Sequence, residues 1–271
     1  MKNIKKYQHF FDENKNTWNL KTKEHTKSEF YNVEQFKKGT CSLNSFELSE
    51  LGDVAGKSLL HLQCHFGLDT LSWSRRGAVC TGIDFSGEAI KFAKNLANEL
   101  KLKTNFIKCN VYDVQEKVEG LFDIVFTSYG VIGWLPDLTD WAKIISQKLK
   151  VGGVFYMVEF HPIVWMFDYL KTPPKLSYPY KSNQVIYEEY EGTYANTNAK
   201  ITSKEYGWNH GLGNVVTALS SVGLQIEFLH EHSNSPYNCL PDLMEKENGM
   251  FGLQPKNDLY PLLFSIRAVK K

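Results

Sequence analysis

Arginine is scarce in this chain of 271 residues, and neither sign of charge dominates it. The only arginines are Arg75, Arg76 and Arg267, and 31 basic residues stand against 30 acidic ones, which leaves a net charge of +1. Arginine is the usual bidentate reader of guanine and phosphate, and a strong basic field is what draws a protein to a nucleic-acid backbone. We therefore expect no nucleic-acid partner.

Long apolar runs and paired cysteines are also missing. No window approaches the roughly 18 apolar residues of a membrane helix, and the polar opening MKNIKKYQHFFDENKN lacks the apolar stretch of a signal peptide. The five cysteines, at positions 41, 64, 80, 109 and 239, contain no CxxC pair, and free thiols are typical of a reducing compartment. These absences predict a cytoplasmic protein that does not enter a membrane.

Apolar and aromatic residues are plentiful, since 42% of the chain is hydrophobic and 14% is aromatic. A chain of this composition buries a sizeable core, which excludes wholesale disorder. At roughly 150 residues per domain, the length allows one large domain or two small ones.

Short apolar runs alternate with helical patterns from residue 58 onward. Gly77 can cap the end of one helical stretch and Ser86 the start of the next. Strands that alternate with helices are typical of βαβ units and of a parallel sheet buried on both faces. We expect strands over 58–63, 79–83, 105–109, 122–127 and 154–159, and helices over 68–76, 86–100 and 137–149, the last of them stopped by a turn at Gly152 and Gly153.

The flanking segments complete a single domain over residues 1–271. Four of the nine prolines and many tyrosines fall within 160–207, a composition too aromatic for a solvated linker and better suited to a structured insertion or lid. Within it, we expect a strand over 185–194 to pair with 200–206. The other parts are a cap over 1–56 with short helices at 4–13 and 43–51, a cofactor-binding core over 57–159, and a C-terminal part over 208–271 with a helix at 212–222 and strands at 224–230 and 261–269.

The stretch 57–88, KSLLHLQCHFGLDTLSWSRRGAVCTGIDFSGE, reads as strand, turn, helix, strand and then an acidic residue. In doubly wound folds ligands bind at the carboxyl ends of the strands, so the turn and Asp84 face one crevice. Asp84 is placed to accept hydrogen bonds from both hydroxyls of a ribose. The helix start after residue 66 offers free backbone N–H groups to an anionic group.

A dinucleotide is disfavoured at this turn. The G-x-G-x-x-G pattern lets the backbone approach a pyrophosphate, but its glycine positions hold Gln63 and His65, and Gly67 alone is kept. Two bulky side chains oppose that approach. A nicotinamide-dependent oxidoreductase is therefore the weaker interpretation, which tight binding of NADH would restore.

At the level of motifs the chain resembles the class I S-adenosylmethionine (SAM)-dependent methyltransferases, and more closely a bacterial subgroup whose first motif reads LHLQCHFG-x-DTLS. The usual first motif of the wider superfamily, (D/E)-x-G-x-G-x-G, is replaced here by His61, Gln63, His65 and Gly67. The matching stretches, spread over most of residues 25–270, are HTKSEFY at 25–31, FKKGTCSL at 36–43, LLHLQCHFGLDTLSW at 59–73, GAVCTGIDFSGEAI at 77–90, FDIVFTSYGVIGWLPDL at 122–138, LKVGGVFYMVEFHP at 149–162 and YGWNHGLGNVVTALSSVGL at 206–224.

The resemblance implies a Rossmann-like three-layer α/β sandwich with a mostly parallel, seven-stranded sheet whose last strand, 261–269, runs antiparallel beside 224–230. It also implies methyl transfer from SAM to a small molecule, with S-adenosylhomocysteine as the product. By position, Asp84 binds the ribose, Phe85 lies against the adenine, and Asn110 holds the adenine edge. The full cofactor set implied in this way is His61, Gln63, Cys64, His65, Gly67, Asp84, Phe85, Asn110, Val111, Asp113 and Ser128.

Methyl transfer is an in-line displacement, so the acceptor must lie about 3–3.5 Å from the methyl carbon with water excluded. A general base is needed only if the acceptor arrives protonated. His161 and Glu159, at the end of the fifth strand, and His210, before the next helix, are the candidates. Each histidine also has a structural interpretation, as a hydrogen-bonded residue before Pro162 or as a loop cap. Candidates for the acceptor pocket are His25, Ser28, Tyr31, Tyr129, Trp134, Trp165 and Trp208.

Two further interpretations stay open. The glycine-poor loop also fits a protein that binds SAM without transferring its methyl group, and the absence of turnover with any acceptor would identify such a protein. His61, Cys64 and His65 have a spacing that suggests a metal site. Residues 61–63 should alternate in a strand, however, and no fourth ligand is evident, so we expect no metal.

Overall fold

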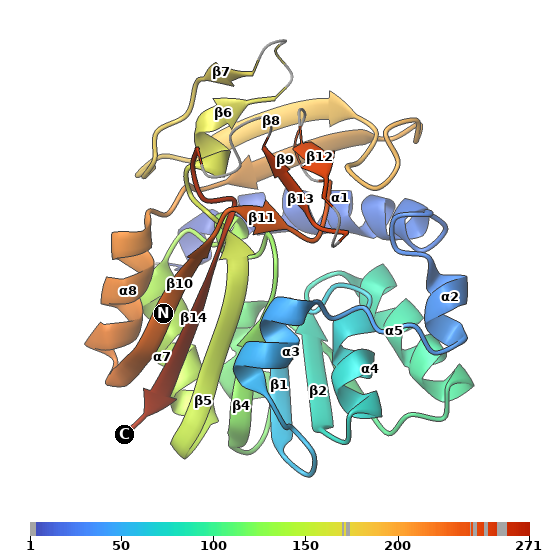
Figure 1. Ribbon diagram of the computed structural model, residues 1–271, viewed down its shortest axis with the longest axis vertical. Helices are drawn as coiled ribbons and strands as arrows, with labels where there is room; N and C mark the ends of the chain where they lie inside the picture. Colours follow the sequence, from blue (N-terminus) through green and yellow to red (C-terminus); the bar gives the residue numbers. More distant parts are fainter. Residues whose placement is uncertain are drawn as a thin grey trace.

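The computed structural model describes residues 4–169, 171, 174–238, 240, 243–246, 249–253 and 259–271. Its centre is a seven-stranded sheet in the order β10-β14-β5-β4-β1-β2-β3 (Figure 1). Neighbouring strands are parallel except where β14 runs antiparallel to both β5 and β10. This confirms the expected sheet and its antiparallel last strand. The strands are β1 (Ser58–Leu62), β2 (Val79–Asp84), β3 (Asn105–Lys108), β4 (Phe122–Thr127), β5 (Leu149–Phe160), β10 (Leu224–His232) and β14 (Leu263–Lys270).

Helices cover both faces of the sheet because the central strands are apolar on both sides. Along β1, Leu60 and Leu62 join the apolar cluster that contains α6, α7 and α8, whereas Leu59 joins the one that contains α3 and α4. A third cluster joins α4 to α5. As expected, the side chain of Ser86 caps α5 by accepting a hydrogen bond from the Ala89 amide. The helices are α3 (Ser45–Leu51), α4 (Leu68–Arg75), α5 (Gly87–Glu99), α6 (Val114–Lys117), α7 (Leu138–Lys148) and α8 (Leu212–Ser221).

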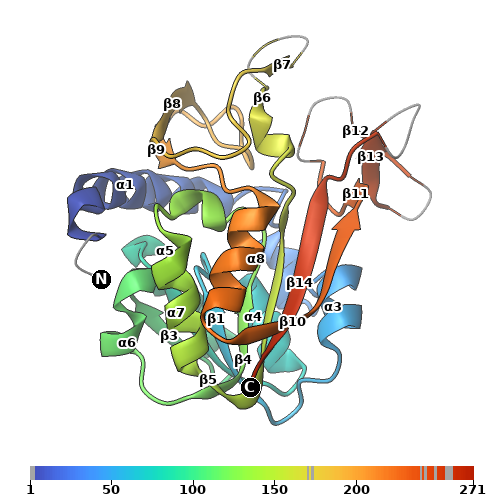
Figure 2. The ribbon, with the colours of Figure 1, turned by 90° about the vertical axis from the view of Figure 1, so that its left-hand side faces the viewer.

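The N-terminal helix is longer than the pattern over 4–13 predicts. After η1 (Ile4–Tyr7), α1 (Gln8–His25) runs for 18 residues. Both views show it lying across the end of the sheet beneath the hairpin of β8 (Ile186–Glu191) and β9 (Thr202–Gly207) (Figures 1 and 2). The side chain of Asn14 donates to the carbonyl of Tyr206 and accepts from its amide, both at 2.8 Å. The Thr17 hydroxyl donates to the carbonyl of Lys204 at 2.7 Å. These polar contacts hold a helix that apolar periodicity does not reveal.

Small accessory elements lie above the carboxyl ends of the strands (Figure 1). The expected hairpin is present, since β8 (Ile186–Glu191) pairs antiparallel with β9 (Thr202–Gly207). No helix among the described residues is both long and apolar enough to cross a membrane. The other accessory elements are α2 (Val33–Lys37), η2 (Val111–Asp113), η3 (Ile132–Trp134), η4 (Val164–Met166), the pair β6 (Phe167–Asp168) and β7 (Lys175–Leu176), and the small sheet of β11 (Asn234–Ser235), β13 (Phe251–Leu253) and β12 (Leu243–Glu245).

The predicted turn at Gly152 and Gly153 does not end a helix. α7 already ends at Lys148, and β5 begins at Leu149. The pairing of β5 with β4 jumps from Leu149 to Val154, so the intervening residues form an irregularity within the strand. A Cβ atom on Gly153 would lie 2.9 Å from the carbonyl oxygen of Lys150, which explains a glycine there.

Candidate active site

The loop after β1 has a backbone conformation typical of glycine at two positions that carry side chains. Gln63 and His65 have φ angles of +54° and +49°, a left-handed region that side chains rarely occupy. The Cys64 amide, between them, donates to the carbonyl of Ile83 at 2.8 Å. A Cβ atom on Gly67 would lie 2.7 Å from the ring of Phe106. Strain of this kind is found at functional sites, where the surrounding structure enforces it.

Asp84 ends β2 beside this loop. Its two carboxylate oxygens accept hydrogen bonds from the backbone amides of His65 (2.9 Å) and Ser86 (2.8 Å). Burial raises the pKa of Asp84 to about 7, although these amide bonds act in the opposite direction. Asp84 thus ties the β1 loop to the start of α5, and its carboxylate keeps acceptor capacity for a ligand hydroxyl.

A pair of imidazoles joins α1 to the loop. His25 Nδ1 lies 3.0 Å from His65 Nε2, and the ring of Trp18 packs edge-on against His65. Burial lowers the pKa of His25 to about 3, and it lowers the pKa of His65 as well. The pair is therefore neutral. Three buried polar atoms here have no partner in the described structure: His25 Nε2, His65 Nδ1 and Gln63 Oε1.

The residues expected around the adenine lie at the ends of β2 and β3. The Asn110 side-chain oxygen accepts from the amide of Tyr112 at 3.1 Å and caps η2. Val111 is buried, Asp113 is exposed and Phe85 is half-buried. Asn110 therefore has a capping contact in this structure, and its contact with adenine stays a prediction.

A carboxylate that the sequence reasoning did not single out lies next to His61. The Ser128 hydroxyl donates to Asp69 Oδ2 at 3.3 Å and lies 3.4 Å from His61 Nε2. Ser42 donates to the other oxygen of Asp69 at 2.6 Å. Burial raises the pKa of Asp69 and lowers that of His61 to about 3. The only sequence signal for Asp69 was its place in the first turn of the helix that follows Gly67.

Four tyrosines and a phenylalanine converge over the same end of the sheet, and we call them the tyrosine cluster. They come from four separate segments of the chain. Tyr129 and Tyr237 meet edge-on with ring centroids 5.1 Å apart, and Phe30 stacks on Tyr237 at 5.6 Å. The hydroxyls of Tyr31 and Tyr194 are hydrogen-bonded to each other, and Phe30 and Tyr194 form a rim that is 43% and 50% exposed.

Several members of the predicted acceptor pocket take part in this convergence. The ring of His25 contacts those of Tyr31 and Tyr194, with centroids 5.3 and 4.7 Å apart. The Ser28 hydroxyl donates to the carbonyl of His25 at 2.8 Å. Trp134 joins through Trp18, whose ring it meets edge-on at 5.4 Å.

Two of the predicted tryptophans lie elsewhere. Trp208 is buried against Tyr7 and Phe10. Trp165 is 41% exposed and contacts Phe160. Neither has a ring contact with the tyrosine cluster in the described structure, because Trp208 packs on the N-terminal segment and Trp165 packs on Phe160.

Glu47 is hydrogen-bonded to Tyr129. Its Oε2 accepts from the Tyr129 hydroxyl at 2.8 Å, and its Oε1 accepts from the amide of Asn44 at 2.9 Å. The Asn44 side chain also donates to the hydroxyl of Tyr237 at 3.1 Å. Glu47 is fully buried, and burial raises its pKa to about 7. Nothing in the sequence pattern distinguished this glutamate from an ordinary helix residue.

The candidate bases near β5 have structural partners. Glu159 accepts from the amides of Gly130 and Val131, at 2.5 and 2.7 Å, and so holds the loop after β4. His161 Nε2 lies 2.9 Å from a Glu231 oxygen, while its Nδ1 accepts from the amide of Ile163. His210 Nε2 donates to the carbonyl of Leu135 at 2.6 Å. These contacts favour the structural interpretation of both histidines, whose catalytic role stays a prediction.

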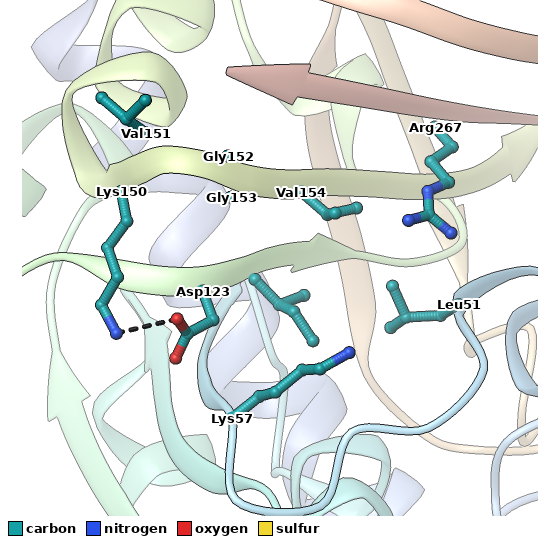
Figure 3. Close-up of a pocket in the computed structure, with 10 residues that line it drawn as sticks. Leu51, Lys57, Asp123, Lys150, Val151, Gly152, Gly153, Val154 and Arg267 are labelled. Atoms are coloured by element: carbon teal, nitrogen blue, oxygen red, sulfur yellow. Dashed lines mark hydrogen bonds and ion pairs between the residues drawn. The ribbon is translucent and has the colours of Figure 1, made fainter. Parts of the chain in front are cut away.

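A cavity of about 240 Å³ lies at the opposite end of the sheet (Figure 3). Lys57, Lys150 and Arg267 contribute to its wall, and Lys150 Nζ pairs with Asp123 at 2.8 Å. This cavity adjoins the amino ends of β1 and β4. Ligands of open α/β sheets bind at the carboxyl ends, so we assign the cavity no part in the reaction.

Residues 60–157 match the family model described as "Methyltransferase domain". Among curated proteins, the ubiquinone biosynthesis O-methyltransferase of Escherichia fergusonii is 31% identical over 106 residues, which cover 39% of this chain and 44% of the relative. The enzyme of the same name from Alkalilimnicola ehrlichii is 29% identical over 122 residues, 44% of this chain and 49% of that one. The chain thus spans about half the length of the curated relatives it matches.

The fold is that of the SAM-dependent methyltransferases. A structure of one from Clostridium acetobutylicum superposes with a TM-score of 0.56 and 12% identity, covering 98% of both chains. Geranyl diphosphate C-methyltransferase from Streptomyces coelicolor, solved with S-adenosyl-L-homocysteine, gives a TM-score of 0.54 and 15% identity over 83% of this chain and 77% of that one.

Proposed function

We propose that this protein is a SAM-dependent methyltransferase that acts on a small molecule. The observation that carries the proposal is the pairing of Asp84 with the strained loop 63–67 at the carboxyl ends of β1 and β2. That location is where an open α/β sheet binds its ligand. The match of residues 60–157 to a methyltransferase domain supports the same assignment.

The residues present fit SAM. Asp84 can accept hydrogen bonds from ribose hydroxyls through its remaining lone pairs. The unpartnered Gln63 Oε1 and His65 Nδ1 are buried polar atoms, and such atoms cost free energy until a ligand satisfies them. Bound SAM would supply an electrophilic methyl group.

This chain's own part in the reaction is to position the reactants and exclude water. α1 covers the loop through Trp18 and His25, and the tyrosine cluster closes the adjoining space above β4. Catalysis of an in-line displacement depends chiefly on such positioning. We place the enzyme in the cytoplasm, where Cys41, Cys64, Cys80 and Cys109 would remain the free thiols that they are here.

Formation of S-adenosylhomocysteine tests the proposal. Purified protein is incubated with SAM and with pooled small-molecule fractions of a cell extract, and the product is measured by mass spectrometry. We expect product to form with at least one fraction and to be lost in Asp84→Asn. Binding of SAM without product from any fraction would instead identify a non-catalytic SAM-binding protein.

A further inference from the structure

Within the described part of the chain, the fully buried Glu47 and the partly buried Asp69 adjoin the tyrosine cluster without a cationic partner. Glu47 is fully buried, and Asp69 bonds only to the hydroxyls of Ser42 and Ser128 among the residues that the structure describes. Neither forms an ion pair within the described ranges, where Lys21, the buried lysine of α1, is instead paired with Glu205. Buried carboxylates of this kind favour a positively charged ligand, because a cation offsets the cost of burying the negative charge.

The rings above these carboxylates also suit a cation. Tyr129 meets Tyr237 edge-on and Phe30 stacks on Tyr237, while the hydroxyls of Tyr31 and Tyr194 bond to each other. Phe30 and Tyr194 form the partly exposed rim. Aromatic faces attract ammonium groups, more strongly when the site is shielded from water. The combination of rings and carboxylates favours a positively charged ligand, which a purely apolar pocket would not.

An unsatisfied group independently indicates a ligand here. The side chain of His25 is 0% exposed, its Nδ1 is taken by His65, and its Nε2 has no partner. Its ring lies against Tyr31 and Tyr194 of the cluster. A buried polar atom left unpaired in this way is explained when a ligand or water fills the place beside it.

We infer that the methyl acceptor is an amine that enters the tyrosine cluster as an ammonium ion, and that Tyr129 and Glu47 take its proton. The inference rests on the proposed function and names the substrate class for that same site. Tyr129 already donates its hydroxyl hydrogen to Glu47 Oε2 at 2.8 Å. A proton from the ammonium can therefore pass to the Tyr129 oxygen as the tyrosine proton moves to Glu47.

The step balances. The ammonium loses one proton to Glu47, which frees the lone pair that methylation requires. A nitrogen–carbon bond then forms as the carbon–sulfur bond of the donor breaks, and the electron pair of that bond stays on sulfur. The methylated nitrogen keeps the positive charge, and Glu47 releases its proton to solvent.

Glu47 also has a structural role, which the test must separate from its role in ligand binding. It forms a capping box with Asn44 at the start of α3. Glutamine serves this box as well as glutamate does. Glu47→Gln therefore keeps an acceptor for the cap while it removes the charge and one of the two acceptor oxygens, and Glu119→Gln on the exposed surface is its matched control.

A matched pair of probes measures charge recognition directly. Choline and 3,3-dimethyl-1-butanol have the same shape and differ in the charge at the quaternary centre. We titrate each into protein saturated with S-adenosylhomocysteine. Choline should bind at least about tenfold more tightly than the alcohol, and Glu47→Gln should remove about that factor, whereas Glu119→Gln should not.

Equal affinity for the two probes, binding of neither, or an unchanged preference in Glu47→Gln would overturn the inference. Its failure is distinct from failure of the proposed function, because S-adenosylhomocysteine is titrated first. If that ligand binds and choline does not, the amine inference fails alone. If choline binds with charge preference and S-adenosylhomocysteine does not bind, the methyltransferase proposal fails and the cation site stands.

Discussion

At the scale of single residues, the loop 63–67 combines a conformation suited to glycine with side chains that can bind a ligand. Glycine at positions 63 and 65 would remove the strain of φ angles near +50°, but it would also remove the contacts that those side chains make. Gln63 donates to the carbonyl of Val131 at 3.0 Å, and His65 meets His25. The strain is thus balanced by contacts across the site.

Asp84→Asn should weaken SAM binding by roughly 2 kcal/mol or more, because the ribose loses charge-assisted hydrogen bonds. Calorimetric titration of the variant measures this, and Asp53→Asn, in an exposed turn, is the control. A thermal melt confirms that the loop still folds. Equal SAM affinity in Asp84→Asn and wild type would refute the ribose assignment.

Glu47→Gln should change how stability depends on pH. Burial raises the pKa of Glu47 from 4.5 to about 7. A carboxyl group whose pKa is raised on folding stabilises the fold below its unfolded pKa, and that contribution is lost as the pH rises through about 7. Glutamine stays neutral, so the variant should gain about 1–3 kcal/mol of unfolding free energy relative to wild type between pH 5 and pH 8. Urea denaturation at both pH values measures this difference, and a constant difference would contradict it.

The sequence was informative about Asp84 and silent about Glu47 for a physical reason. The role of Asp84 is predictable because this residue directly follows a recognisable strand. The roles of Glu47, Asp69 and Tyr237 depend on contacts between distant parts of the chain. Local spacing in the sequence does not predict such contacts.

At the scale of elements, two residues with positive φ angles, one after α5 and one in the loop before α4, separate strain from function. Lys101 follows α5 with φ +54° and is exposed. Lys101→Gly should stabilise the protein by about 0.5–1 kcal/mol, because glycine adopts this conformation without strain. His65→Gly relieves the same strain but loses the contact with His25, so it should not stabilise. Denaturant unfolding of both variants measures the two changes in unfolding free energy. An equal gain in both would show that the His25–His65 pair does not contribute to stability.

The placement of α1 depends on polar anchors. Asn14→Ala removes both hydrogen bonds to Tyr206 and should lower the unfolding free energy by about 1–3 kcal/mol. It should also weaken SAM binding, because α1 covers the loop. Asn16→Ala, on the exposed side of the same helix, should stay within about 0.5 kcal/mol of wild type. Similar effects in the two variants would mean that α1 is not held through Asn14.

The elements of the core were predictable because each carries its own signal. β4 has the predicted bounds, and the Ser86 cap lies where α5 begins. α1 was not predictable at its full length, since its anchors lie on β9 in a distant part of the chain. The beginning of β5 at Leu149 was missed because its glycines suggested a turn.

At the scale of the whole molecule, the fold gathers four chain segments over one end of the sheet. Residues 30–31, 129, 194 and 237 meet there. The alternation of strands and helices predicted the sheet and hence the edge where a ligand binds. It did not predict which side chains of the cap, the insertion and the C-terminal part would meet above that edge, because the accessory segments follow no regular period.

Equilibrium titration of the wild-type protein with SAM, S-adenosylhomocysteine and NADH tests the central claim most directly. We predict micromolar binding of both sulfur ligands and none of NADH, because Asp84 and the loop 63–67 suit a nucleoside without a pyrophosphate. Tight binding of NADH, or no binding of either sulfur ligand, would contradict the account.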